Sequence, residues 1–172
     1  AAMGLGAETA RRLAREGASV LLTDIVDDQG EAVAREIRET GARAQYRRQD
    51  VTSEQGWAAV SPEAVALFRG LHVLVNNAGI SGGSVPLADL SLADWRRVLS
   101  VNLDSVFLGL RACAPRIAAS GGGSIINLSS ILGKVGLPNS GAYCASKGGV
   151  LLLTKAAALE WAAQGVRVNS IH

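Results

Sequence analysis

The sequence predicts an α/β protein in which a doubly wound parallel sheet carries helices on both faces. Short runs of β-branched and aliphatic residues alternate with helix-like segments of ten or more residues along the 172 positions. Strands and helices that alternate in this way form βαβ units, whose right-handed crossovers place parallel strands side by side. Polar residues also gather where the strands end, and ligands of doubly wound sheets bind outside those ends.

The alternation gives a definite series of elements. Strands are predicted at 19–23, 44–48, 73–76, 124–128 and 167–170, and helices at 7–17, 28–40, 53–69, 92–119 and 141–164. Gly17 and Gly41 are expected to end the first two helices, because glycine adopts the conformation that often follows a helix. Pro62 should break or restart the helix at 53–69, since proline removes a backbone donor.

Composition and charge argue against several functions. The formal net charge is +2, and the nearest basic cluster, Arg43, Arg47 and Arg48, lacks the interleaved aromatic residues of a nucleic-acid surface. We therefore expect no nucleic-acid partner. No apolar run is long enough to span a membrane and no signal peptide is recognisable, so we expect a cytoplasmic protein without a membrane partner.

The two cysteines and the chain length bear on metal binding and on the number of domains. Cys113 and Cys144 lie in apolar helical segments without metal-ligand spacing. Both are expected to be reduced core or near-core residues, and no metal site is predicted. A length of 172 residues fits one domain over 1–172.

The first candidate site residues are those that suit a dinucleotide. Gly4-Leu5-Gly6 opens the first helix, where glycines let the backbone approach a pyrophosphate and helix amides meet its charge. Asp24 ends the next strand, where a carboxylate can accept hydrogen bonds from the adenine ribose. It would repel a 2′-phosphate, and neither Met3 nor Ile25 offers a compensating positive charge, so NAD is expected rather than NADP. The alternatives are a simple loop-to-helix turn and an aspartate that only caps a turn.

Two further strand ends carry polar residues. Asp50 and Val51 follow the strand at 44–48 and suit an adenine edge, the first through its side chain and the second through its backbone. Asn76-Asn77-Ala78-Gly79 follows the next strand, where the amides could brace strand ends and line a cofactor groove. Because asparagine and glycine are common turn residues, a plain turn is the alternative.

Tyr143 and Lys147 are the strongest candidates for chemistry. They are four residues apart, so on a helix they share one face, with Cβ atoms about 5–6 Å apart. An ammonium at that distance favours the phenolate, which could make the tyrosine a proton shuttle near neutral pH. An ordinary surface tyrosine beside a surface lysine has the same spacing.

Three more polar residues accompany this pair. Ser129 and Ser130 end the strand at 124–128, where a hydroxyl could hold a substrate oxygen or simply form a turn. Asn102 lies in an apolar helix. It is either a buried amide that satisfies nearby backbone groups or the holder of a water that relays protons to Lys147.

In this order and spacing the motifs resemble the short-chain dehydrogenase/reductase family over residues 1–172, and within it bacterial NAD-dependent secondary-alcohol and hydroxysteroid dehydrogenases. The resemblance implies a Rossmann-like fold and hydride exchange between NAD and a secondary alcohol or ketone. Tyr143 would be the general acid/base, and Ser130 would orient the reacting oxygen, so both would bind substrate. Lys147 would bind the nicotinamide ribose, and Asn102 would maintain the proton relay.

The resemblance also assigns the remaining contacts. Ser130 is preferred to Ser129 because the family's serine lies thirteen residues before its tyrosine. Cofactor contacts are implied at Gly4, Leu5, Gly6, Asp24, Ile25, Asp50, Val51, Asn77, Ala78, Gly79, Tyr143 and Lys147. A homotetramer or homodimer is implied for the complete protein.

The departures from the family pattern lie at the two ends. The family's first strand and first phosphate-loop glycine would precede Ala1, and a substrate-covering segment would follow His172. The fold is therefore expected to be incomplete at both ends, and an isolated 1–172 polypeptide to be poorly stable. Two other functions stay open. One is a nucleotide-binding fragment without catalysis, which the set Ser130, Tyr143 and Lys147 argues against. The other is epimerase or dehydratase chemistry, which Asn76 to Gly79 argue against.

Overall fold

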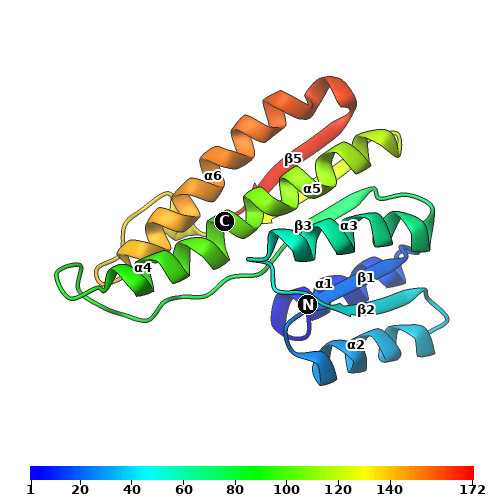
Figure 1. Cartoon of the computed structure of the whole chain (residues 1–172), viewed down its shortest axis with the longest axis horizontal. Coiled ribbons are helices and arrows are strands. Elements are labelled where there is room, and N and C mark those ends of the chain that lie inside the picture. Colours follow the sequence, from blue (N-terminus) through cyan, green and yellow to red (C-terminus); the bar gives the residue numbers. More distant parts are fainter. The chain divides into compact units, whose positions relative to one another are not determined.

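The computed structural model describes residues 1–172, and the chain divides into two compact units, Ala1–Arg69 and Gly70–His172. Every strand in either unit pairs in parallel, and helices alternate with the strands (Figure 1). The predicted α/β class with a parallel sheet is therefore confirmed. That residues 1–172 form a single domain stays a prediction, and the two units are described in turn.

The first unit contains a two-stranded sheet and three helices. Its elements are α1 (Gly4–Arg15), β1 (Val20–Asp24), α2 (Asp27–Glu39), β2 (Ala44–Arg48) and α3 (Glu54–Phe68). In the register of the pair, Val20 lies opposite Ala44, and Asp24 lies opposite Arg48. This register brings the carboxyl ends of both strands, with their polar residues, to the same edge.

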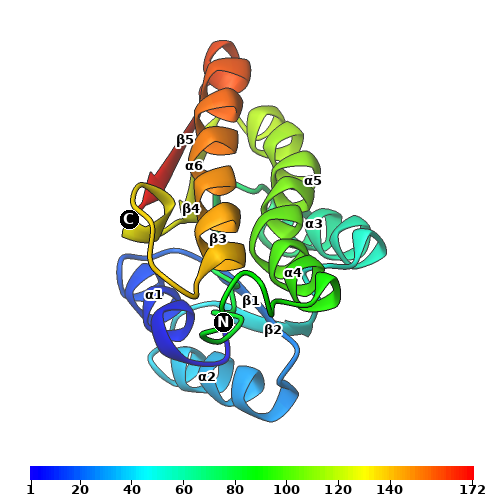
Figure 2. The same ribbon diagram turned by 90° about the vertical axis from the view of Figure 1, so that its left-hand side faces the viewer.

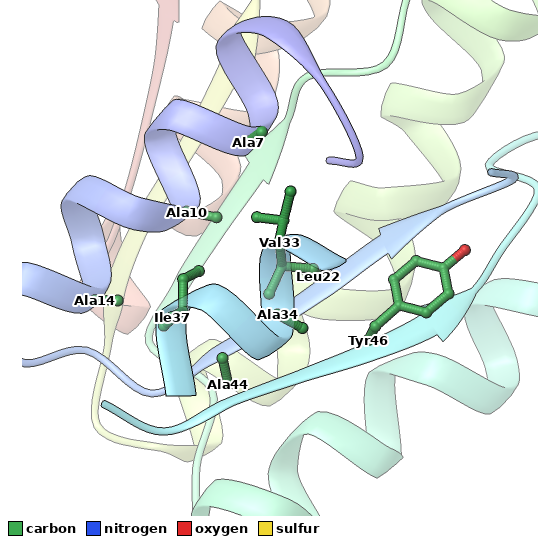
Figure 3. Packing of buried hydrophobic residues seen from close by; sticks show 9 residues of the cluster. All are labelled: Ala7, Ala10, Ala14, Leu22, Val33, Ala34, Ile37, Ala44 and Tyr46. Carbon is green, nitrogen blue, oxygen red and sulfur yellow. The ribbon is translucent and has the colours of Figure 1, made fainter. Parts of the chain in front are cut away.

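A small apolar core lies where α1 and α2 pack on the β1–β2 sheet (Figure 3). Its buried members are Ala7, Ala10, Ala14, Leu22, Val33, Ala34, Ile37, Ala44 and Tyr46. The three alanines of α1 recur at intervals of three and four, so they form one helical face with small side chains. The Tyr46 ring lies directly under Gly30 of α2, where an added Cβ would stand 2.1 Å from the ring carbon Cε2. Glycine is thus required at this position by close approach.

Helix α3 passes through Pro62, so the predicted break at this residue is wrong. Proline deprives the helix of one backbone hydrogen bond, but side chains hold the preceding turns. Ser53 caps the helix start by accepting the Gly56 N–H at 3.0 Å, and the buried Ser61 hydroxyl donates to the Trp57 carbonyl at 2.8 Å. These bonds offset part of the loss at Pro62.

The second unit contains a three-stranded sheet in the order β3-β4-β5. Its elements are β3 (Val73–Asn76), α4 (Leu92–Leu99), the π-helical turn η1 (Ser100–Asp104), α5 (Ser105–Ala119), β4 (Gly123–Leu128), the 3-10 turn η2 (Ile131–Gly133), α6 (Gly141–Trp161), the 3-10 turn η3 (Ala162–Gln164) and β5 (Val166–Ile171). Helices α5 and α6 run side by side over this sheet (Figure 2). Cys113 of α5 is buried, as predicted, and burial raises its pKa to about 12.

The helical stretch Leu92–Ala119 corrects one expectation from the sequence. By length and composition it could cross a membrane, with a mean hydropathy of 1.2 over its most apolar window. The prediction that no apolar run is long enough is therefore wrong by this criterion. Half of the window is buried inside the protein, as in the core helix of a globular protein.

Candidate active site

In the second unit, Tyr143 and Lys147 lie on the first two turns of α6, which begins at Gly141. The Lys147 side chain is buried, with 4% of the residue exposed, and its Nζ lies 5.8 Å from the centre of the Tyr143 ring. Nζ donates a hydrogen bond of 2.6 Å to the Leu128 carbonyl at the end of β4. Burial lowers the pKa of Lys147. An ordinary surface pair is thereby excluded, because the ammonium lies inside the unit.

The turn after β3 lies against the same lysine. A Cβ added to Gly79 would stand 3.4 Å from Lys147 Nζ and 3.4 Å from Asn102 Oδ1. The segment Asn77-Ala78-Gly79 therefore leads directly to the catalytic candidates. Tyr143, Lys147, Asn102 and Gly79, which are far apart in the sequence, meet in one place.

Asn102 is fully buried in the π-helical turn between α4 and α5. Its Oδ1 accepts the Ile80 N–H at 2.7 Å, and its Nδ2 donates to the Ile80 carbonyl at 2.9 Å and to Ser146 Oγ at 3.1 Å. Ser146 in turn donates to the Tyr143 carbonyl at 2.7 Å. Asn102 thus joins the loop after Gly79 to the first turn of α6. The buried-amide alternative describes this side chain, and the water relay stays a prediction.

A buried polar network braces the strands behind this group. Asn76 Nδ2 donates to Asn127 Oδ1 at 2.8 Å, and Asn127 Nδ2 donates to Thr154 Oγ1 at 2.9 Å. The Thr154 hydroxyl donates in turn to the Val150 carbonyl at 2.7 Å. The bracing role predicted for Asn76 is confirmed, and it connects β3, β4 and α6.

The two serines after β4 do different things. The Ser130 hydroxyl accepts the Leu132 N–H at 3.1 Å, so its own proton remains available to a substrate oxygen. The Ser129 hydroxyl instead donates to the Lys147 carbonyl at 2.8 Å. The preference for Ser130 as the substrate-facing serine fits this difference. A turn-forming role was one alternative for Ser129, but its bond to Lys147 was not predicted, since this partner lies eighteen residues away.

A small hollow that is open to solvent adjoins Tyr143. Its lining residues come from the loop after β3 and from the start of α6: Ser81, Gly82, Gly83, Val85, Leu90, Asn139, Ser140, Gly141, Ala142 and Tyr143. The Val85 N–H donates to the Asn139 carbonyl at 2.9 Å, which ties the two segments together. No role for Val85 or Leu90 was predicted from the sequence. Apolar side chains in a glycine-rich loop were the feature of the sequence that could have indicated a contact with substrate.

In the first unit, helix α1 begins at Gly4, three residues earlier than predicted, and Gly4 itself has a φ of 56°, in the left-handed region that favours glycine. No side chain caps this start, and no acidic residue lies in the first turn. Helices α3 and α4 are capped by Ser53 and Ser91, whereas α2, α5 and α6 start without a side-chain cap, as α1 does. The amides of the first turn of α1 have no partner within the helix, which suits an anion such as pyrophosphate.

Asp24 closes the turn after β1. Its Oδ1 accepts the N–H groups of Ile25 at 2.8 Å and Val26 at 3.1 Å, and its Oδ2 accepts the Ala2 N–H at 2.8 Å. The turn-capping alternative is thus observed, and a bond to ribose stays a prediction.

A positive charge that the sequence analysis missed lies beside this turn. Arg48 donates to the Ile25 carbonyl at 2.6 Å and to Asp27 Oδ2 at 2.9 Å. Neither Met3 nor Ile25 carries a positive charge, as stated from the sequence, but Arg48 places one beside Ile25. Arg48 comes from β2, and only the strand register brings it opposite Asp24. Its charge is paired with the Asp27 carboxylate.

The end of β2 carries the adenine candidates. Asp50 Oδ1 accepts the Thr52 N–H at 2.9 Å and the Thr52 hydroxyl at 2.8 Å, and these hydrogen bonds lower the pKa of Asp50. The Val51 carbonyl accepts the Trp57 indole N–H at 2.9 Å. Gln49 was missed by the sequence analysis. It is 3% exposed, and neither polar atom of its amide has a hydrogen-bond partner.

Comparison with known proteins adds independent information. The sequence pattern of the short chain dehydrogenase family matches residues 1–172. A cis-4-hydroxycyclohexanecarboxylate dehydrogenase from Sinomonas cyclohexanicum is 46% identical over 99% of this chain and 68% of its own. A structure of NAD⁺-bound xylitol dehydrogenase superposes with a TM-score of 0.95 at 36% identity, covering 98% of this chain and 65% of its own.

A second solved structure bears on the cofactor. A metagenomic short-chain oxidoreductase in complex with NADP has a TM-score of 0.93 at 38% identity, over 98% of this chain and 76% of its own. The chain thus spans about two thirds to three quarters of the length of these proteins. Both kinds of nicotinamide dinucleotide occur among the structures it resembles.

Proposed function

Because this chain belongs to the short-chain dehydrogenase family, we propose that the protein is an oxidoreductase that transfers hydride between NAD(H) and a secondary alcohol or its ketone. The observation that carries the proposal is the buried Lys147, whose ammonium is held by the Leu128 carbonyl beside the Tyr143 ring. A buried ammonium beside a tyrosine that lines a pocket is more typical of a catalytic site than of a packing contact.

Each polar side chain of the site has a separate role in the proposed reaction. During oxidation the Ser130 hydroxyl donates a hydrogen bond to the substrate oxygen, and Tyr143 takes up the hydroxyl proton. Lys147 holds positive charge near Tyr143 and reaches the nicotinamide ribose. Asn102 keeps the loop after Gly79 against α6 through its bonds to the Ile80 backbone. A bound nicotinamide supplies the hydride acceptor in oxidation and the hydride donor in reduction.

The residues of the first unit fit the remaining parts of a dinucleotide. The uncapped start of α1 at Gly4, Leu5 and Gly6 would bind the pyrophosphate. Asp24 and Ile25 would bind the adenine ribose, and Asp50 with Val51 would bind the adenine. In the second unit, Asn77, Ala78, Gly79 and Lys147 would contact the nicotinamide half.

NAD is proposed over NADP on electrostatic grounds. The Asp24 carboxylate would repel a 2′-phosphate, and the Arg48 charge that could offset it is paired with Asp27. In the full-length protein, Asp24→Ser should raise the ratio of kcat/KM with NADP to that with NAD at least tenfold, which is about 1.4 kcal/mol. A wild-type protein that already uses NADPH better than NADH would overturn the choice of NAD.

The substrate is proposed to be a small secondary alcohol. The pocket beside Tyr143 combines apolar Val85 and Leu90 with polar Ser81 and Asn139. The Sinomonas relative is named for a ring hydroxyl, and the xylitol dehydrogenase for a polyol. A panel of cyclic and linear alcohols, followed by absorbance of reduced nicotinamide, would define the class. No change in absorbance with any of them would favour a fragment without catalysis or epimerase chemistry.

A homodimer or homotetramer in the cytoplasm is proposed for the complete protein. Leu152 and Leu159 of α6 are 66% and 83% exposed, and Phe107 of α5 is 47% exposed. Leu108 of α5 and Trp161 of α6 are half-buried. Light scattering on the full-length protein and on Leu152→Glu would test this. A monomer for the wild type would contradict it.

Tyr143→Phe is the direct test of the reaction. General acid/base catalysis contributes about 10²–10⁴-fold, so turnover should fall by at least a hundredfold. Binding of NADH, followed by its fluorescence, should stay within about twofold of wild type because the ring and Lys147 remain. Near-normal turnover by this variant would refute the role assigned to Tyr143.

A further inference from the structure

The proposed reaction gives no role to Ser129 or Gly133, yet both residues lie against the backbone of Lys147. The Ser129 hydroxyl donates to the Lys147 carbonyl at 2.8 Å, while the Lys147 ammonium donates to the Leu128 carbonyl at 2.6 Å. The end of β4 therefore holds Lys147 at both its backbone and its side chain. Leu128, the last residue of β4, and Ser129, which follows it, make these two bonds to a single residue of α6.

Gly133 lies in η2, the turn that follows Ser130. A Cβ added there would stand 2.7 Å from the Lys147 carbonyl oxygen and 3.0 Å from Ser129 Oγ. Its φ is not in the left-handed region, so the need for glycine is one of space. The Gly133 N–H donates to the Ser130 carbonyl at 2.9 Å. The turn that carries Ser130 is thus pressed against the backbone of Lys147.

We infer that Ser129 is a positioning residue, which fixes the distance between the Ser130 hydroxyl and the face of α6 that carries Tyr143 and Lys147. Gly133 allows the turn after Ser130 to approach α6 as closely as this distance requires. The inference rests on the proposed function, because it matters only if Ser130 and Tyr143 act on one substrate oxygen. Ser129 touches no reacting atom. It acts by holding the Lys147 carbonyl, one helical turn after Tyr143.

The expected consequence is a loss in the chemical step. A misplacement of about 1 Å can cost about a hundredfold in rate. In the full-length protein, Ser129→Ala should lower kcat at least tenfold while the Kd for NADH stays within about twofold. Ser129→Thr, which keeps a hydroxyl, should restore most of the lost kcat. Hydride transfer should become more rate-limiting, so the isotope effect with carbinol-deuterated substrate should rise in Ser129→Ala.

Gly133→Ala tests the same spacing without removing a hydrogen bond. Its methyl group would push η2 away from Lys147, so the same fall in kcat is expected, and the double variant should lose less than the two effects combined. The matched control is Ser120→Ala at the far end of α5, where the serine donates to the Arg116 carbonyl at 2.8 Å and accepts the Leu71 N–H at 3.0 Å. This variant should lower the Tm but leave kcat unchanged.

The possible outcomes separate this inference from the proposed function. Wild-type kcat in folded Ser129→Ala, or an equal fall in Ser120→Ala, overturns the positioning role. If Ser129→Ala does not fold, unchanged kcat in Gly133→Ala overturns it. A loss that Ser129→Thr does not restore also counts against it. Failure of the proposed function is recognised independently, by normal turnover in Tyr143→Phe.

Discussion

The contact between Gly30 and Tyr46 gives the sharpest prediction about the first unit. Gly30→Ala places a methyl group where the Tyr46 ring carbons lie 2.1, 2.5 and 2.8 Å away. A helical Gly→Ala change alone stabilises by about 1 kcal/mol. Here the ring cannot stay, because heavy atoms of this kind approach no closer than about 3.5 Å at their optimum.

The cost follows from what the ring does. Overpacking of a core costs about 1–3 kcal/mol. The Tyr46 hydroxyl lies 2.8 Å from both the Asp24 carbonyl and Asp27 Oδ1, and losing a hydrogen bond to a charged group costs about 1.5–3 kcal/mol. After the helix gain is subtracted, Gly30→Ala should lower the free energy of unfolding by about 3 kcal/mol.

Urea unfolding of the full-length protein, with the slope m compared between variants, measures this change. In a Tyr46→Ala background the obstacle is gone, so Gly30→Ala should become stabilising, by up to about 1 kcal/mol. Gly148→Ala on α6 is the matched control, since its nearest atom, the Gly133 carbonyl oxygen, lies at an ordinary 3.5 Å. The reasoning is refuted if Gly30→Ala is as stable as wild type, or if its sign does not change when Tyr46 is removed.

Two predictions concern the second unit. Asn127→Ala leaves the buried Asn76 amide without its acceptor and removes the hydrogen bond that Thr154 accepts, although Thr154 still donates to the Val150 carbonyl. At about 1–3 kcal/mol for each unpaired group, it should destabilise by about 3 kcal/mol in urea unfolding, and wild-type stability would contradict this. Burial lowers the pKa of Lys147 from 10.5 in the folded protein, so the unfolded chain binds the Lys147 proton more tightly. The charged lysine therefore destabilises the folded protein, and this destabilisation decreases as the pH rises from the folded pKa toward 10.5. Lys147→Met should flatten this alkaline gain in stability, whereas Lys155→Met, on the exposed side of α6, should leave it intact; equal slopes in wild type and Lys147→Met would disprove the explanation.

The order of the elements and the type of fold could be predicted from the sequence because they depend on local spacing. The strands predicted at 44–48 and 73–76 coincide with β2 and β3. The failure at Pro62 has a tertiary cause. The loss of one hydrogen bond in α3 is local, but the ion pair between Arg47 of β2 and Glu63 of α3 connects the helix to the sheet of its unit.

The site was predictable only in part. The spacing of Tyr143 and Lys147 put them on one helical face, and that much is a property of any helix. Their environment depends on partners distant in the chain, since Lys147 Nζ meets Leu128 nineteen residues away and Asn102 meets Ile80 twenty-two residues away. Arg48 beside Ile25 is of the same kind, because it follows from the strand register.

The sequence by itself determined which residue types stand at the strand ends and which pair lies on the face of α6, because helix and strand periodicity is imposed by backbone sterics over a few residues. Only the tertiary structure decided that the lysine is buried, that Ser129 binds the Lys147 carbonyl while Ser130 keeps its proton, and that Asp24 closes its own turn. These facts depend on which backbone groups are left unpaired when helices pack on a sheet. Such groups take whatever partner the packing brings within about 3 Å.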